Sequence, residues 1–161
     1  MYVDVGGGST EVNLLIKGEL VCSKSYNIGT VRMLNDAVDF EEWKRLEADM
    51  KTLSENYLGT NIIGSGGNIN KLYRLAEKTD KKRQRISVIV LKSLYEKLKL
   101  LSFEERMQVF NLKPDRADVI VPASEIFLTI AEILHSEYIY VPVIGLADGI
   151  IDGLYAANRN R

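Results

Sequence analysis

Cysteine and histidine occur only once each in this 161-residue chain, as Cys22 and His135. A single cysteine excludes an internal disulfide and cannot form a metal site by itself. Cys22 lies in a strand-like pattern, so we expect a small core residue there. His135 follows a long apolar segment, where a position at a helix end explains it without any catalytic role.

Long apolar runs and an excess of charge of one sign are also lacking. The longest apolar runs, such as 138–146, are too short to cross a bilayer. The formal net charge of −1 gives no general attraction to nucleic acids or membranes. No signal-peptide pattern opens the sequence. We therefore expect a cytoplasmic protein that binds neither nucleic acid nor membrane.

The residues that are present are typical of a globular domain. Hydrophobic residues make up 46% of the chain and charged residues 27%, and its length fits one domain with a sizeable core. Strand patterns cover 2–16, with a turn at three glycines, then 20–28, a short stretch ending at 63, and 138–143. Helical patterns cover 30–38, 40–58, a stretch ending at 76, 88–101, a short stretch after 102, 117–134, and a last stretch from 148. This order predicts an α/β fold, a mixed sheet that begins with an antiparallel hairpin and has helices packed on it.

Several local signals refine these elements. Asp39 is placed to cap the helix 40–58, and Ser102 with Glu105 has the spacing of a capping box. Pro122 interrupts the apolar segment 117–134, where we expect a kink or a break. The helix after residue 30 is expected to carry its apolar residues on one face: Val31, Leu34 and Val38. The basic segment 78–85 is expected to be an exposed connection.

Two glycine-rich turns, "DVGGGSTE" and "GSGGN", each follow a short apolar strand. Glycine has no side chain and tolerates positive φ, so its backbone N–H groups can approach an anion closely. Ser9, Thr10, Ser65 and Asn68 add possible side-chain donors. The alternative is that these glycines only form tight turns, but two such turns together favour phosphate binding.

Carboxylates flank the first turn. Asp4 ends the strand before it and Glu11 follows it, so both can face the same mouth. Mg²⁺ often binds one or two carboxylates together with waters and phosphate oxygens. The alternative is a solvated pair of acids beside a turn. A phosphoanhydride under attack by water needs its charge neutralised, which two amide-lined turns and a metal can supply.

The chain resembles the exopolyphosphatase/guanosine pentaphosphate phosphatase (Ppx/GppA) family of the actin-like ATPase superfamily, which has a ribonuclease H-like fold. The blocks that carry this resemblance run in order along the chain: "DVGGGSTEV" (4–12), "IGTVRM" (28–33), "IGSGGNINKLYRL" (63–75), "LSFEER" (101–106), "LKPDRADVIVPASEIF" (112–127) and "GLADGIIDGL" (145–154). Members begin with a similar lobe that carries the main catalytic glutamate. We therefore expect 1–161 to be one domain, the second lobe, with the N-terminal lobe outside this chain.

The resemblance implies hydrolysis of terminal phosphate from inorganic polyphosphate or guanosine pentaphosphate with Mg²⁺. It implies that Asp4 and Glu11 hold the metal, that Glu11 also helps to position water, and that Arg116 contacts substrate. The implied phosphate-binding residues are Gly6, Gly7, Gly8, Ser9, Thr10, Ser65, Gly66, Gly67 and Asn68. An Arg116 paired with a neighbouring aspartate is the alternative, and Arg32 is expected mainly to support the cleft.

Other partners and functions follow from the same comparison. The missing lobe is the expected partner, and a homodimer is possible. Alternative functions are a regulatory module that binds (p)ppGpp or polyphosphate without turnover, and an ATP-dependent member of the superfamily. The family's last block is commonly similar to GLR-E-GLL, whereas this chain has Ala147 and Asp148 and lacks that basic side chain. At Asn68 threonine is often found in the family. The basic run 81–85 is a solvated loop or a guide for a polyphosphate chain.

Overall fold

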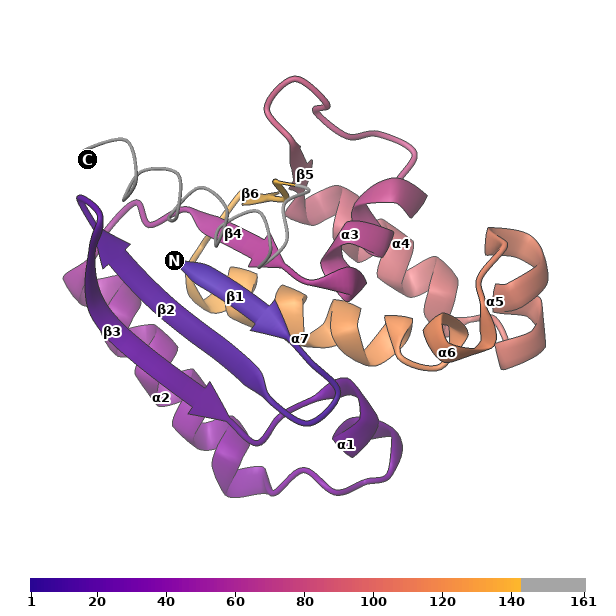
Figure 1. Cartoon of the computed structure of the whole chain (residues 1–161), viewed down its shortest axis with the longest axis horizontal. Coiled ribbons are helices and arrows are strands. Elements are labelled where there is room, and N and C mark those ends of the chain that lie inside the picture. Colours follow the sequence, from indigo (N-terminus) through magenta and orange to yellow (C-terminus); the bar gives the residue numbers. More distant parts are fainter. Residues whose placement is uncertain (143–161) are drawn as a thin grey trace, which may run out of the picture.

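A computed structural model describes residues 1–142, and residues 143–161 lie outside that description. Within residues 1–142, six strands form one mixed sheet in the order β3-β2-β1-β4-β6-β5 (Figure 1). The strands are β1 (Tyr2–Val5), β2 (Thr10–Ile16), β3 (Glu19–Tyr26), β4 (Ile62–Ser65), β5 (Arg85–Ser87) and β6 (Tyr138–Tyr140). β1, β4 and β6 are parallel, whereas β2 pairs antiparallel with β1 and β3. The predicted mixed sheet with an antiparallel start is confirmed.

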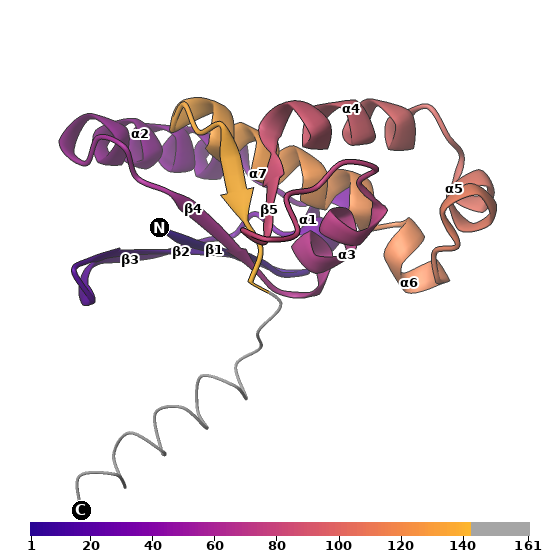
Figure 2. The ribbon, with the colours of Figure 1, turned by 90° about the horizontal axis from the view of Figure 1, so that it is seen from above.

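The helices are α1 (Thr30–Leu34), α2 (Phe40–Asn56), α3 (Gly67–Leu75), α4 (Val88–Lys99), α5 (Phe103–Phe110), α6 (Pro114–Ala117) and α7 (Ile120–Ile133). Figure 2 shows α2, α4 and α7 together on one side of the sheet. Because side chains alternate along a strand, Val3 and Val5 of β1 are buried in the core, whereas Tyr2 and Asp4 are exposed on the other face. No helix within residues 1–142 is both long and apolar enough to cross a membrane.

The predicted helix starts are confirmed. The Asp39 side chain accepts a hydrogen bond from the backbone N–H of Glu41 at 2.9 Å and begins α2. Ser102 and Glu105 form the expected capping box at the start of α5. The apolar spacing in α2 produces its buried face, which consists of Leu46, Met50 and Leu53.

One expectation about the helices was wrong, and another was met only in part. The helix expected over 30–38 ends at Leu34, so Val38 lies outside it. Val31 and Leu34 are 48% and 46% exposed, and α1 is held through its backbone, as described below. Pro122 does not kink α7, since it is the third residue of that helix, where the missing N–H has no intrahelical acceptor to lose. The apolar segment 117–134 is interrupted before the proline, between α6 and α7.

The connection through 78–85 is exposed over most of its length but ends in a strand that the sequence did not indicate. Arg85 begins β5, which pairs antiparallel with β6. Elsewhere β3 ends at Tyr26 rather than at residue 28, and the helix expected from residue 148 lies outside the described residues. His135 is exposed directly after α7, as expected.

A polar cluster joins α2 to the edge strand β3. The Tyr26 hydroxyl donates to Asp49 Oδ2 at 2.9 Å, and Lys24 Nζ donates to Asp49 Oδ1 at 2.6 Å. Burial, reinforced by the Asp49 carboxylate, raises the pKa of Tyr26 far above its usual value, so the phenol remains a hydrogen-bond donor even in alkaline solution. The pairing of β2 with β3 shifts register between Leu14 and Leu15, which marks a bulge.

We expect Asp39→Ala to lower the free energy of unfolding by about 1 kcal/mol, because it removes the side-chain cap of α2. Urea denaturation of the variant measures this change. Asp39→Asn is the matched control: asparagine caps as well as aspartate, so its stability should stay close to that of the parent chain. An equal loss in both variants would show that the negative charge, rather than the cap, stabilises the helix start.

Candidate phosphate-binding site

The first glycine turn joins β1 to β2 and is fastened to α1 by its carbonyl groups. The carbonyl of Gly6 accepts a hydrogen bond from the backbone N–H of Thr30 at 3.0 Å. The carbonyl of Gly7 accepts one from the backbone N–H of Val31 at 2.9 Å. The first amides of α1, which have no acceptor inside the helix, are thereby satisfied by the turn.

The third carbonyl of the turn is held by a side chain. Arg32 Nε donates to the carbonyl of Gly8 at 2.7 Å, so this arginine supports the turn as expected. The peptide bonds here are trans, and the N–H of a trans peptide points opposite to its carbonyl. The N–H groups of Gly7, Gly8 and Ser9 therefore point away from α1. Within residues 1–142 they donate no hydrogen bond, which leaves them available to an anion.

Gly29, just before α1, makes this contact possible and was not singled out from the sequence. A Cβ at this position would lie 2.4 Å from the carbonyl oxygen of Gly7 and 2.5 Å from the backbone nitrogen of Ser9. Both are backbone atoms, so a side chain could not be accommodated by a rotamer change. Only glycine allows the turn and α1 to approach so closely.

Asp4 and Glu11 are direct cross-strand partners on either side of the turn. Glu11 Oε1 accepts hydrogen bonds from the hydroxyls of Ser9 at 2.6 Å and Ser25 at 3.3 Å. Asp4 is exposed, and no ion pair of residues 1–142 involves either acid. Like charges directly opposite each other on a sheet are destabilising. The pair therefore has an electrostatic reason to bind a cation.

The second glycine turn lies beside Asp4 because β1 and β4 are parallel. Ser65, the last residue of β4, is the register partner of Asp4. Gly66 follows with a φ of 92°, and a Cβ there would be 2.6 Å from Asp4 Oδ1. Gly66 also begins α3, which has no side-chain cap. The carboxyl ends of two strands and an uncapped helix start thus meet at one edge of the sheet, an arrangement suited to a phosphate.

Asn68 connects this turn to β1 and to Arg116. Its amide nitrogen donates to the carbonyl of Val5 at 2.9 Å, and its oxygen accepts from Arg116 Nη1 at 2.9 Å. The guanidinium lies over Gly67, where a Cβ would come within 2.9 Å of Arg116 Nη2. Arg116 also lies 3.8 Å from Asp115. Arg116 is therefore held mainly by its hydrogen bond to Asn68 rather than by Asp115, and it lies at the second glycine turn.

The residues of this site fit a metal that is held only in part by protein. No cluster of three or more acidic, histidine or cysteine side chains suited to a metal occurs in the described part of the chain. Two opposed carboxylates remain, which is the usual protein contribution to a Mg²⁺ ion that keeps waters and phosphate oxygens. Asp4 and Glu11 are therefore the residues that would hold it.

Three predicted side-chain donors are engaged in the fold, and one of them is Ser9, whose hydroxyl donates to Glu11. The Thr10 hydroxyl is fully buried and donates to the carbonyl of Ile28 at 2.7 Å, so its side chain is not available to a phosphate. Both ends of the Asn68 amide are likewise occupied. Roles for the remaining residues in binding phosphate stay predictions. Gly7, Gly8 and Gly67 are exposed, and the site is open to solvent on this side.

Comparison with known proteins gives a consistent match. The model of the Ppx/GppA phosphatase family matches residues 1–157. A Ppx/GppA phosphatase structure from Aquifex aeolicus is 28% identical with a TM-score of 0.72, over 94% of this chain and 55% of that chain. A second structure of the Aquifex aeolicus family member is 27% identical with a TM-score of 0.73, over 98% and 56%. An exopolyphosphatase from Cytophaga hutchinsonii shares the fold at 18% identity, with a TM-score of 0.75 over 97% and 56%.

This chain therefore spans about half the length of these solved structures. No curated protein matches it.

We expect Gly29→Ala to displace the first glycine turn and lower the free energy of unfolding by about 1–3 kcal/mol, the usual cost of overpacking. Chemical denaturation measures the cost, and amide chemical shifts of the turn report its displacement. Gly8→Ala is the control, because a Cβ there meets nothing within 4 Å. A Gly29→Ala variant as stable as the Gly8→Ala variant would contradict the close approach.

Proposed function

This chain belongs to the Ppx/GppA phosphatase family, and from that premise we propose that it forms one half of a phosphoanhydride phosphatase site. The substrate we propose is the terminal phosphate of inorganic polyphosphate, or of guanosine pentaphosphate. The observation that carries the proposal is the pair Asp4 and Glu11, directly opposed across a turn whose amides point outward. The ribonuclease H-like arrangement brings the second glycine turn to the same edge.

Each group has a distinct role in this proposal. The free N–H groups of the first turn and the uncapped start of α3 bind the oxygens of the terminal phosphates. Arg116, oriented by Asn68, neutralises further negative charge. Mg²⁺ held by Asp4 and Glu11 would supply charge neutralisation on the phosphoryl group. Glu11, oriented by the Ser9 hydroxyl, also helps to position the attacking water.

The open geometry of the site supports a reaction shared between two lobes. Asp4, Gly7 and Gly67 are exposed, so these residues alone do not exclude water from a bound phosphate. Catalysis by positioning and electrostatics requires a closed, organised site. We therefore propose that this chain acts as the second lobe and that a first lobe supplies the opposite wall and the main catalytic base. By itself the chain would bind substrate but hydrolyse it poorly.

We expect Mg²⁺ to strengthen the binding of tripolyphosphate to this chain, because the metal links the acid pair to the phosphate oxygens. Calorimetric titration with and without Mg²⁺ measures the effect. Asp4→Asn and Glu11→Gln should each abolish the increase, whereas Glu47→Gln, an exposed acid of α2, should retain it. Mg²⁺-independent binding in all variants would remove the metal from the proposal.

Activity is tested on a longer protein in which a family first lobe precedes this chain. Phosphate release from polyphosphate and from guanosine pentaphosphate should require Mg²⁺ and should fall on the order of 10²-fold or more in Asp4→Asn and Glu11→Gln. If the longer protein binds these polyanions but releases no phosphate, the enzyme proposal is overturned and the chain is part of a sensor of these polyanions.

A further inference from the structure

The near-zero net charge of this chain hides a strong local asymmetry. Residues 71–85 contain seven of the 21 Lys and Arg residues but only two of the 22 Asp and Glu residues. This stretch therefore carries a charge of +5, and the remaining residues together carry −6. It comprises the second half of α3, the connection that follows and the first residue of β5.

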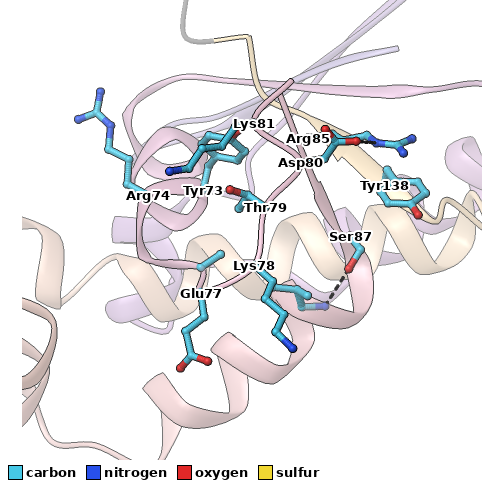
Figure 3. Close-up of a pocket in the computed structure, with 12 residues that line it drawn as sticks. Tyr73, Arg74, Glu77, Lys78, Thr79, Asp80, Lys81, Arg85, Ser87 and Tyr138 are labelled. Atoms are coloured by element: carbon cyan, nitrogen blue, oxygen red, sulfur yellow. Dashed lines mark hydrogen bonds and ion pairs between the residues drawn. The ribbon is translucent and has the colours of Figure 1, made fainter. Parts of the chain in front are cut away.

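The connection is folded back on itself and held at its base. The backbone N–H and carbonyl of Asp80 exchange hydrogen bonds with those of Arg85, at 3.0 and 3.1 Å. The Asp80 carboxylate accepts from the backbone N–H of Arg83 and from Arg85 Nε, both at 3.1 Å. The Arg85 guanidinium lies 3.7 Å from the centre of the Tyr138 ring, an arrangement that Figure 3 shows. These contacts fix the two ends of the loop, and its basic tip, residues 81–83, projects from them.

Both acids of the stretch are already neutralised. The backbone N–H of Arg83, followed by the Arg85 guanidinium, holds the pKa of Asp80 below its usual value. Glu77 is paired with Lys97 at 2.7 Å on α4. By contrast, within residues 1–142 no ion pair involves Lys78, Lys81 or Lys82.

Two of these three cations border a depression of about 750 Å³, which is of a size that holds a ligand (Figure 3). Its lining includes Lys78 and Lys81, together with the hydroxyl-bearing side chains of Tyr73, Thr79 and Ser87. Glu77 and Asp80 also line it, but each carboxylate is already paired with a cation of the chain, Lys97 and Arg85 respectively. The lysine ammonium groups and the hydroxyl donors therefore remain for phosphate oxygens. The position is separate from the glycine turns, because it lies at the opposite end of α3.

We propose that this depression and the loop 78–85 form a second binding site for the body of a linear inorganic phosphate chain. The proposal rests on the proposed function for the nature of the ligand. Arg74 lies seven residues along α3 from Gly67, about 10 Å at the helical rise of 1.5 Å per residue. A long chain whose end lies at the glycine turns can reach the loop, whereas a very short one cannot.

The aromatic residues favour a phosphate chain over a nucleic acid. Proteins that bind single-stranded nucleic acids combine cations with aromatic rings on which bases stack. Here the Tyr138 ring is covered by Arg85, and the connection 76–84 contains no aromatic residue. Of the rings that line the depression, this leaves Tyr73 for a base, so the site offers mainly charge and hydroxyls.

The test compares this chain with the double variant Lys81→Ala/Lys82→Ala. The probes are long-chain inorganic polyphosphate, tripolyphosphate and a single-stranded RNA, each titrated by fluorescence or calorimetry. We expect the double variant to bind long-chain polyphosphate about tenfold more weakly, as the loss of two solvated ion pairs implies, and to bind tripolyphosphate unchanged. Lys51→Ala/Lys99→Ala, which removes two exposed lysines from α2 and α4, is the charge-matched control and should bind both like the parent.

The outcomes separate this inference from the proposed function. Equal affinity of the loop and control variants for long-chain polyphosphate would overturn the second site, even if Mg²⁺-dependent binding of tripolyphosphate persists. If the parent chain binds neither long-chain polyphosphate nor tripolyphosphate, the proposed function is overturned as well. RNA bound as tightly as polyphosphate, with the same loss in the loop variant, would make the loop a nucleic-acid site instead.

Discussion

The carbonyl oxygens of Gly6 and Gly7 accept the first amide hydrogens of α1, and the arrangement of the site depends on this contact. Because carbonyl and N–H point in opposite directions in a trans peptide, fastening the carbonyls to α1 turns the amides outward. The same turn carries Asp4 and Glu11 at its two ends. One segment of backbone therefore sets both the outward-pointing amides and the opposed carboxylates, and the close approach at Gly29 keeps that segment against α1.

The sequence predicted this part of the molecule well because the relevant information is local. Alternating apolar residues around a glycine run specify two paired strands, and strand pairing alone makes Asp4 and Glu11 neighbours. Gly29 was missed because its role appears only when α1 meets a turn some twenty residues earlier in the chain. Thr10 was expected to offer its hydroxyl to phosphate, but the alternation that buries Val12 also buries Thr10. Strand β5 has three residues and forms by pairing with β6. It is too short to show an alternating pattern in the sequence.

Net charge is a poor guide to what this surface attracts. A net charge of −1 excludes a strong electrostatic field around the whole chain. Residues 71–85 nevertheless carry a net positive charge, whereas the remaining residues carry a net negative one. At physiological ionic strength a field reaches only about 8 Å, so a ligand close to the surface responds to the nearest side chains rather than to the sum. The chain can therefore present an acidic pair at one end of α3 and a basic loop at the other without mutual cancellation.

The bulge between Leu14 and Leu15 affects how the molecule meets other copies of itself. β3 is an edge of the sheet, and an unpaired edge is a template for strand addition and aggregation. A bulge increases the local twist and interrupts the regular spacing of hydrogen bonds in the hairpin to which β3 belongs. Charged side chains at Glu19 and Lys24 line the same strand. This edge also exposes Leu20 and Val21, so the bulge is the feature of β3 that acts most directly against the addition of a second chain.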